Sequence, residues 1–246
     1  MHNATLGLII GLLTSQLAIL ITTVYLHRGL SHKALTLNAK VAFIMRAILW
    51  ITTGIRPRQW VAVHRKHHAY TDIEGDPHSP IIEGFKEIQF GNVYFYRKEA
   101  TKPETIAKYA KDLPPDRWDK VLFDRALLGL AVGIAILFAI GGWEVALIGS
   151  VVHVISYLGL SAAVNAIGHT FGKRPYPNLA TNNGWLAMIT FGEGLHNNHH
   201  AAPTAAKLSF HAGEFDPAWL LIAALAKVGL ANVRLKEPKF KSQTLT

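Results

Sequence analysis

The chain has 246 residues, of which 50% are hydrophobic and 17% are charged, and it contains no cysteine. The absence of cysteine excludes disulfides, zinc knuckles, iron–sulfur clusters and thiol catalysis. Soluble domains average about 25% charged residues, so this composition argues against an ordinary soluble domain and against disorder. The formal net charge of +9 suits a membrane surface or an anionic substrate better than nucleic acid. We expect a bilayer partner and no nucleic-acid partner.

Three apolar stretches are long enough to cross a bilayer. The first, residues 6–26, covers a hydrocarbon core of about 30 Å at about 1.5 Å per residue. No basic residue precedes it and no small-residue cleavage site follows it, so it is interpreted as a transmembrane helix rather than a signal peptide. The other two stretches, 122–140 and 143–166, flank Gly141-Gly142. They predict a helical hairpin that spans the membrane twice.

The positive charges predict the orientation of these spans. All 25 Lys and Arg residues lie within 27–125 or 173–246, so the positive-inside rule places both regions in the cytoplasm. The apolar segment 41–55 must then enter and leave on one side, as a re-entrant or interfacial helix. We predict an all-α integral membrane protein, a single domain over 1–246 with about three transmembrane helices, one re-entrant helix and a cytoplasmic helical cap carrying a histidine-rich dimetal site.

Nine of the 13 histidines fall into four short groups along the chain. These nine are His27, His32, His64, His67, His68, His169, His196, His199 and His200. Two groups read H-x-x-H-H, in which all three rings can point to one place because residues three and four apart share a helix face. His27 and His32 are five apart and would diverge on a regular α-helix, so we expect the helix to open at Gly29.

The histidine positions require the same topology as the charges. If residues 41–55 crossed the bilayer, His27 and His64 would lie on opposite sides and could not share a metal. With that segment re-entrant, all nine histidines lie on the cytoplasmic side, at or near the ends of spans. The repeated pattern predicts a shared metal site rather than isolated polar groups.

The ligand types narrow the choice of metal. Neutral imidazole suits zinc, copper, iron and nickel. Nine histidines exceed the needs of one tetrahedral zinc and suit two metals with four to six ligands each, for which two redox-active irons are favoured. Asp72, Asp76 and Glu193 lie beside the histidine groups and are candidates to orient ligand N–H groups, with solvated loop or helix-cap carboxylates as the alternative. Asn165, four residues before His169, could hold a metal-bound water.

The motifs occur in the order and spacing of a known family. They are HRGLSH (27–32), HRKHH (64–68) followed by GDPHSP (75–80), NAIGH (165–169) and GEGLHNNHH (192–200). From about residue 5 to residue 235 the chain resembles the membrane acyl-CoA desaturase family of the stearoyl-CoA desaturase type, in a compact bacterial form. One departure is Ala162, where the family has a tryptophan three residues before the motif asparagine.

The resemblance implies a function and a set of roles. The nine histidines would ligate two Fe²⁺ ions that react with O₂, Asn165 would hold a water, and His78 of GDPHSP would support the ligands. The enzyme would be an O₂-dependent fatty acyl desaturase in a bacterial inner membrane, with its active site on the cytoplasmic side. Its substrate would be carried by CoA, a carrier protein or a lipid. Electrons would come from a separate ferredoxin, flavoprotein or cytochrome b5-type donor.

Substrate binding gives further expectations. An unactivated methylene offers no acid–base handle, so the cofactor must carry the chemistry and an apolar tunnel must deliver the acyl chain. The resemblance places the tunnel end against the first span, where Ser15 and Ile19 are candidates to line it, with core packing as the alternative. Trp60 matches a family tryptophan near the bend of the chain. A basic surface suited to CoA phosphates, an acidic carrier protein or anionic lipid is predicted at Arg56, Arg58, Arg65, Lys66, Arg97 and Lys98.

Other functions remain open from the sequence. A related diiron membrane hydroxylase or acetylenase would share the same ligands. A zinc-dependent membrane hydrolase or a metal transporter could also use two H-x-x-H-H sets, although a transporter needs ionisable groups within its spans and only Glu144 and His153 qualify. His153 lies 16 positions before His169, about 24 Å along a helix, so a hydrogen bond within the bundle explains it better than metal.

Overall fold

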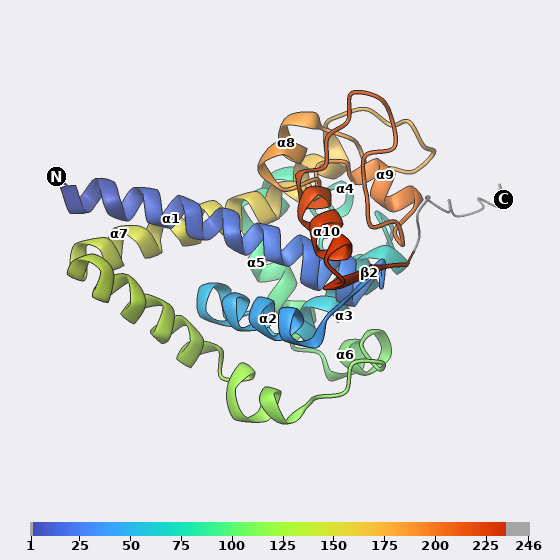
Figure 1. Ribbon diagram of the computed structural model, residues 1–246. Coiled ribbons are helices and arrows are strands. Elements are labelled where there is room, and N and C mark those ends of the chain that lie inside the picture. The colour runs from blue at the N-terminus through green and yellow to red at the C-terminus, as the bar shows by residue number, and fades with distance from the viewer. Residues whose placement is uncertain (1, 235–246) are drawn as a thin grey trace.

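The computed structural model describes residues 2–234, and this part of the chain is mostly helical. Figure 1 shows long helices at one end of the molecule and shorter elements gathered at the other. In chain order the elements are α1 (His2–Ile21), η1 (a π-helix, Thr22–Ser31), β1 (Leu35–Leu37), α2 (Ala39–Thr53), α3 (Pro57–Ala69), α4 (Pro80–Glu83), α5 (Phe85–Ala100), α6 (Pro103–Tyr109), η2 (a π-helix, Asp119–Phe123), α7 (Ala126–Thr170), α8 (Gly184–Ile189), α9 (His196–Ala201), α10 (Pro217–Lys227) and β2 (Ala231–Val233).

Two helical segments of the described chain are long and apolar enough to cross a membrane, His2–Ser31 and Ala126–Thr170. The second is not one straight helix. Its backbone leaves the helical region at Gly141 and at Gly142, where φ is +73°, a conformation that glycine adopts without steric cost. The chain reverses direction there (Figure 1). The predicted turn at these two glycines is therefore confirmed.

The predicted helix bounds need correction. The first helical run begins at His2 rather than residue 6 and continues through η1 to Ser31. The second begins at Ala126 rather than residue 122, because the preceding residues form η2, which an ion pair between Asp119 and Arg46 of α2 fixes in place. The last predicted span, 143–166, continues as helix to Thr170.

Paired glycines allow the long helices to approach one another closely. Gly7 and Gly11 are one turn apart on α1, and a Cβ on Gly11 would lie only 2.7 Å from the Gly149 carbonyl oxygen of α7. Gly129 and Gly133 have the same spacing on α7, and a Cβ on either would collide with a carbonyl oxygen of α2. Small residues four apart are typical of close helix pairs in membranes. They pack α1 and α2 against the two halves of α7.

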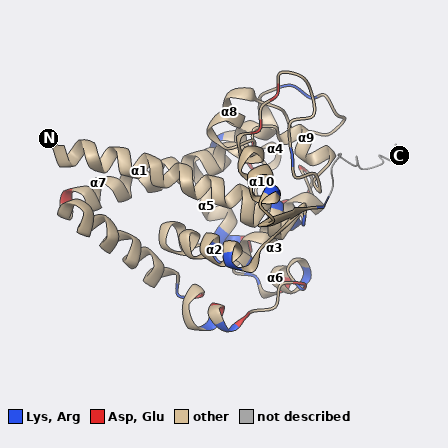
Figure 2. Ribbon diagram, viewed as in Figure 1, with Lys and Arg blue, Asp and Glu red and all other residues tan. Residues whose placement is uncertain are grey.

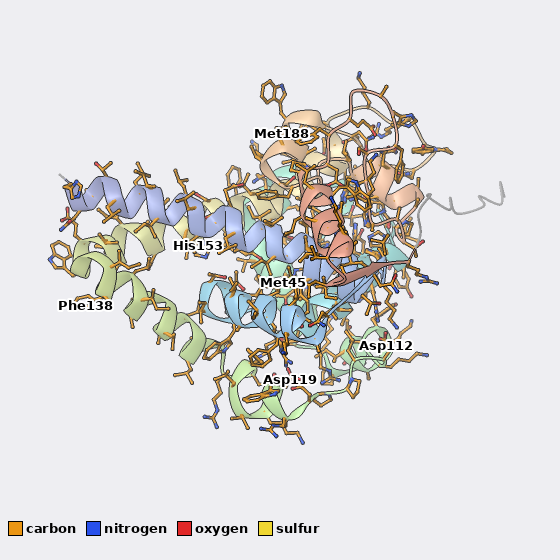
Figure 3. The ribbon with its side chains drawn as sticks, viewed as in Figure 1. Met45, Asp112, Asp119, Phe138, His153 and Met188 are labelled. Carbon is orange, nitrogen blue, oxygen red and sulfur yellow. The ribbon has the colours of Figure 1, made fainter. Side chains whose placement is uncertain are left out.

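The outer faces of the long helices are apolar and open. Large hydrophobic side chains such as Leu13, Phe138 and Ile155 are 63%, 57% and 68% exposed, and Figure 3 shows Phe138 on the outer arm of the α7 hairpin. Lys and Arg are absent from this end and gather at the opposite one (Figure 2). An apolar exposed belt of this extent marks a surface that contacts other apolar material, as a lipid-facing surface does.

The segment predicted to be re-entrant is a helix, α2, joined by a short turn to the helix that follows it, α3. α2 ends at Gly54, whose left-handed backbone (φ 64°) terminates the helix, and α3 begins at Pro57, the first-turn position that proline favours. α2 starts next to the β1–β2 ribbon, and α3 carries the chain back to the level of η1. This geometry brings His64 to His27, as the predicted topology requires.

Candidate metal centre

The first histidine pair is aligned by a π-helix. Hydrogen bonds in a π-helix join residues five apart, and in η1 the N–H of His32 donates to the carbonyl oxygen of His27 over 3.1 Å. The two rings lie 4.9 Å apart between centroids. Both rings face the same group, as expected, but the helix widens into a π-helix rather than being interrupted at Gly29. Gly29 stays within a widened helix, and the wider turn brings the two rings onto one side.

Each H-x-x-H-H motif divides its rings between two places rather than one. On α3, His64 and His68 face one group of histidines while His67 faces another. On α9 the division is reversed, because His196 and His200 join the group of His67, whereas His199 joins the group of His64. Residues four apart share a helix face and the residue between them is rotated away. Each helix thus contributes two rings to one group and one ring to the other.

All nine predicted histidines fall into these two groups, and within each group the potential ligand atoms lie within 4.8 Å of one another. The five-histidine group consists of His27, His32, His64, His68 and His199, and the four-histidine group of His67, His169, His196 and His200. All members of the four-histidine group are buried, whereas three of the five-histidine group are half-buried.

The spacing of the ring nitrogens fits a metal at each group. In the five-histidine group, Nε2 of His27 lies 3.0 Å from Nε2 of His199, and Nε2 of His68 lies 2.9 Å from the same atom. In the four-histidine group, the Nε2 atoms of His196 and His200 are 3.2 Å apart. Imidazole nitrogens bind a metal at about 2.1 Å, so two ligands at a right angle lie about 3.0 Å apart. The observed spacing is that of ligands around a shared ion.

Carboxylates fix the tautomers of three rings. Nδ1 of His67 donates to Asp76 over 2.9 Å, Nδ1 of His169 donates to Asp72 over 2.7 Å, and Nδ1 of His27 donates to Glu193 over 2.8 Å. A carboxylate partner holds the proton on Nδ1 and leaves the Nε2 lone pair free for a metal.

The Nε2 atoms of His67 and His169 show whether the four-histidine group fits a metal. Both are buried and lack a hydrogen-bond partner among the described residues. A buried nitrogen without a partner is costly. A metal ion at the four-histidine group would satisfy both nitrogens, so the donor set fits a metal.

Burial keeps five of the remaining six rings neutral. Desolvation, together with neighbouring histidines, lowers the pKa of His64, His68 and His199 well below the usual value near 6.5, and it does the same for His196 and His200. Neutral imidazole is the metal-binding form. Burial raises the pKa of Asp76, but the hydrogen bond from His67 outweighs it, and that pKa is lowered to about 2. Asp76 is therefore ionised, as a partner of a ligand N–H must be.

This electrostatic arrangement predicts acid lability of the metal-free protein. The unfolded chain binds protons at these histidines below about pH 6.5 while the folded chain does not, so stability falls as pH falls. For each such ring, the free energy of unfolding falls by up to about 1.4 kcal/mol for every pH unit below pH 6.5. Chelator-treated protein in detergent should therefore melt at a much lower temperature at pH 5.5 than at pH 7.5, by differential scanning fluorimetry. An unchanged melting temperature over this range would contradict the arrangement.

Arg28, which no sequence pattern marked as a site residue, links the histidines to the C-terminal part of the described chain. Arg28 is 1% exposed and forms two hydrogen bonds with Asp216, of 2.7 and 3.0 Å, at the start of α10. It also donates to the carbonyl oxygens of Ala206 and Phe191 and lies 3.7 Å from Glu193. The sequence feature that could have indicated Arg28 is its position as the one cation between His27 and His32, directly after the apolar run 6–26.

The other predicted site residues lie at different distances from the two groups. Trp60 stacks on His64 with centroids 4.9 Å apart, and His78 packs its ring 5.1 Å from that of His67. The main-chain N–H of His78 also donates to Asp76. Asn165 is half-buried one turn before His169 on α7. Trp60 and His78 therefore contact the candidate ligands, and Asn165 keeps its predicted place on the helix.

Ser15 and Ile19 lie in the packed bundle. The Ser15 hydroxyl donates to the Gly11 carbonyl oxygen and lies 3.1 Å from Nδ1 of His153. Nε2 of His153 donates to the Thr52 carbonyl oxygen over 2.8 Å, which confirms the predicted hydrogen bond within the bundle (Figure 3). Ile19 is buried against Tyr157. Both side chains contact the core, the alternative considered for them.

Much of the predicted basic surface forms internal contacts. Arg65 pairs with Asp112 and Lys66 with Glu99, while Arg56 and Arg58 donate to carbonyl oxygens of Asp124 and Leu113. These four cations bind α3 and the residue before it to neighbouring segments. The sequence could not show this, because the acidic partners lie 33 to 47 positions away.

The sequence profile described as "Fatty acid desaturase" matches residues 3–229. The chain belongs to the fatty acid desaturase family. It is 34% identical over 86% of its length to an acyl-CoA C20 Delta5-desaturase of Anemone leveillei, covering 68% of that protein. It is 32% identical over 85% of its length to an sn-1 stearoyl-lipid 9-desaturase of Synechocystis sp., covering 65% of it. The chain thus spans about two thirds of the length of these two desaturases.

A third relative performs a related reaction. The chain is 31% identical over 96% of its length to a hex-5-enoyl-[acyl-carrier protein] acetylenase of Moorena producens, covering 79% of that protein. The predicted family is therefore confirmed, and with it an oxidoreductase of the kind that acts on fatty acyl chains. An acetylenase, one of the alternative activities that the sequence left open, is thus among the relatives of this chain.

Proposed function

We propose that this protein is a diiron desaturase that introduces a double bond into a fatty acyl chain, using O₂ and electrons from a separate donor. The observation that carries the proposal is the division of nine histidines into two groups whose ring nitrogens have the spacing of metal ligands. Family membership supports the same reaction class. A zinc hydrolase or a transporter is not supported by any of these relatives.

The roles of individual residues follow from their contacts. The five-histidine group would hold one iron, and the four-histidine group, with a water held by Asn165, the other. When bound, the irons supply the O₂ chemistry that removes two hydrogens from adjacent methylenes, which no side chain can do alone. Asp76, Asp72 and Glu193 hold the protons of three rings on Nδ1 and keep the rings in orientation. His78 packs on His67 and limits its movement.

The chain would cross the membrane three times. We assign α1 and the two halves of α7 as spans and α2 as a re-entrant helix, because α3 returns the chain to the level of its start. Lys and Arg lie at the histidine-bearing end, as Figure 2 shows, which the positive-inside rule places in the cytoplasm. The proposed location is a bacterial inner membrane, with the histidine groups at its cytoplasmic face.

The acyl chain would reach the irons through apolar surroundings next to Trp60 and the first span. Ser15 and Ile19 remain the proposed positions near the end of the chain's path. The names of the three relatives give their substrates as an acyl-CoA, a stearoyl-lipid and an acyl chain on acyl-carrier protein. We therefore assign a fatty acyl thioester or acyl lipid as the substrate class, and no single carrier.

The test is expression in a host that supplies a compatible reductase, followed by mass spectrometry of total fatty acids. Desaturation predicts a new acyl species two mass units below its saturated parent. An acetylenase, favoured by the relative from Moorena producens, would remove two mass units from a monounsaturated chain instead. A hydroxylase would add one oxygen. No change in the acyl profile, with two irons per chain confirmed, would exclude the desaturase.

A further inference from the structure

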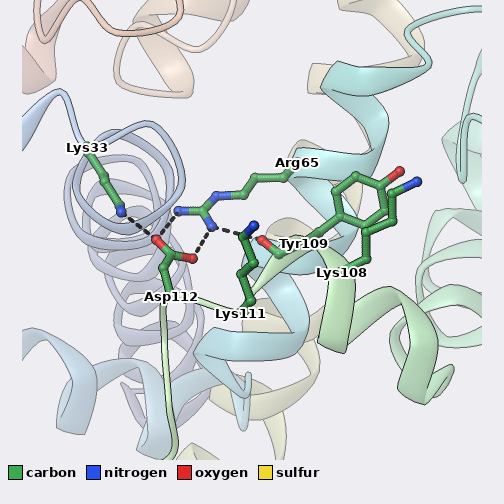
Figure 4. Close-up of a pocket in the computed structure, with 6 residues that line it drawn as sticks. All are labelled: Lys33, Arg65, Lys108, Tyr109, Lys111 and Asp112. Atoms are coloured by element: carbon green, nitrogen blue, oxygen red, sulfur yellow. Dashed lines mark hydrogen bonds and ion pairs between the residues drawn. The ribbon is translucent and has the colours of Figure 1, made fainter.

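A cationic pocket lies on the surface beside the five-histidine group. The pocket has a volume of about 450 Å³ and is lined by Lys33, Arg65, Lys108, Tyr109, Lys111 and Asp112 (Figure 4). A second hollow of about the same volume shares Lys33 and adds Arg234, Thr36 and Asn232. Together the two linings contain five cationic side chains and one carboxylate. The surface therefore suits a broad, negatively charged partner.

The pocket is joined to the candidate ligands through the backbone. Lys33 directly follows His32, and Arg65 directly follows His64. The Arg65 guanidinium donates to the carbonyl oxygens of Leu30 and Ser31, over 2.8 and 2.9 Å. It also donates to the carbonyl oxygen of Tyr109 over 2.8 Å and pairs with Asp112 over 2.6 Å. One side of the pocket is thus one residue away from two members of the five-histidine group.

The histidines next to the pocket are the more exposed ones. His32, His64 and His68 of the five-histidine group are half-buried, whereas all members of the four-histidine group are buried. An electron that enters from the surface therefore meets the five-histidine group first. The cationic pocket lies on the same side, since Lys33 and Arg65 adjoin two of these half-buried rings.

We propose that this pocket and the adjoining hollow are the docking site for a small acidic protein that carries one electron at a time. The inference rests on the proposed function, because the reaction R–CH₂–CH₂–R′ + O₂ + 2 e⁻ + 2 H⁺ → R–CH=CH–R′ + 2 H₂O needs two electrons beyond those of the two broken C–H bonds. Two carriers in succession each give up one electron and leave oxidised.

The arrangement of the cations favours a protein partner over a small phosphate group. Lys33, Lys108 and Lys111 are exposed, and the pocket side chains come from the segment after η1, from α3 and from α6 and its C-terminal extension. Arg65 and Lys33 already pair with Asp112. Transient electron-transfer complexes use small interfaces whose charges steer association rather than grip a ligand.

The test uses the iron-loaded protein in detergent and an acidic plant-type [2Fe–2S] ferredoxin as the probe. The variant is Lys108→Glu with Lys111→Glu, since neither side chain contacts a histidine of the two groups. The control is Lys86→Glu with Lys120→Glu, which changes the charge equally at exposed positions outside both linings. Ferredoxin binding is titrated without acyl substrate, and reduction of the iron by ferredoxin is followed by stopped flow over a series of salt concentrations.

The expected result is at least a tenfold loss of ferredoxin affinity and of its bimolecular reduction rate in the variant at low salt. The loss should shrink as salt rises, and the control should match the wild type. Reduction by dithionite with a viologen dye should be unchanged in both. Equal ferredoxin binding in variant and control overturns the proposal, as does an increased KM for an acyl-CoA with ferredoxin binding intact. If ferredoxin binding depends on these charges but no desaturated product forms, the proposed function would be contradicted and the docking site would stand.

Discussion

Replacing His67 with alanine should reduce the iron content from two ions per chain to about one and abolish desaturation. His67 is fully buried and its Nε2 has no partner among the described residues, while Asp76 holds its Nδ1. Loss of an outer-shell partner alone typically costs 10–100-fold in metal affinity or activity, so loss of the ligand should cost more than about 100-fold. Iron is measured by plasma mass spectrometry and activity by product analysis.

The matched control for this substitution is His153→Ala. His153 is also a buried histidine with hydrogen bonds on both ring nitrogens, but it lies outside the two groups. This variant should keep two irons per chain and lose only thermal stability. Equal loss of iron in the two variants would mean that His67 acts through folding rather than as a ligand.

Replacing Arg28 with lysine should destabilise the protein and loosen the five-histidine group. Lysine keeps the charge but cannot form the two-pronged contact with Asp216 together with the bonds to the Ala206 and Phe191 carbonyl oxygens, and each buried group left without a hydrogen bond costs about 1–3 kcal/mol. Because Arg28 also lies beside Glu193, which orients His27, one iron should bind more weakly. The measurements are chemical denaturation and iron retention under a chelator.

The control for Arg28 is Arg46→Lys. Arg46 also pairs with two aspartates, Asp116 and Asp119, but it lies on α2 and has no contact with Glu193. It should lower stability without changing iron retention. If both lysine variants lost iron equally, Arg28 would have no specific role in orienting His27.

The return of the chain from His27 to His64 could be predicted because two independent constraints agreed. No Lys or Arg lies within residues 6–26 or 143–166, and the nine histidines had to share one site, so residues 41–55 had to bring the chain back. The glycine pair 141–142 marks the turn of α7 because glycine accepts the positive φ observed there. Both inferences use local features of the chain and need no knowledge of distant contacts.

The division of the rings between two groups was beyond the sequence. Helical periodicity shows that His64, His67 and His68 are near one another. It does not show that His67 faces His196 and His200 of α9 while His64 and His68 face His199. The π-helix η1 was also missed, because nothing in the spacing of His27 and His32 distinguishes a widened helix from an interrupted one. Tertiary packing decides both features.

Buried ionic contacts were the other main gap. The partners of Arg28 lie 163 to 188 positions along the chain, and no local pattern connects them. The same is true of Arg65 and Lys66, which the sequence assigned to a substrate-binding surface and which pair internally. Arg65 and Lys66 were recognised without their partners, and Arg28 was not singled out at all, since sequence periodicity contains no information on distant pairs.

The most direct test of the account is anomalous diffraction at the iron edge from crystals of the purified, iron-loaded protein. The account predicts two peaks, one bounded by Nε2 atoms of His27, His64 and His199 and the other by Nε2 atoms of His67, His169 and His196, each nitrogen about 2.1 Å from its metal. A single peak, or peaks away from these rings, would contradict the assignment of nine histidines to two irons.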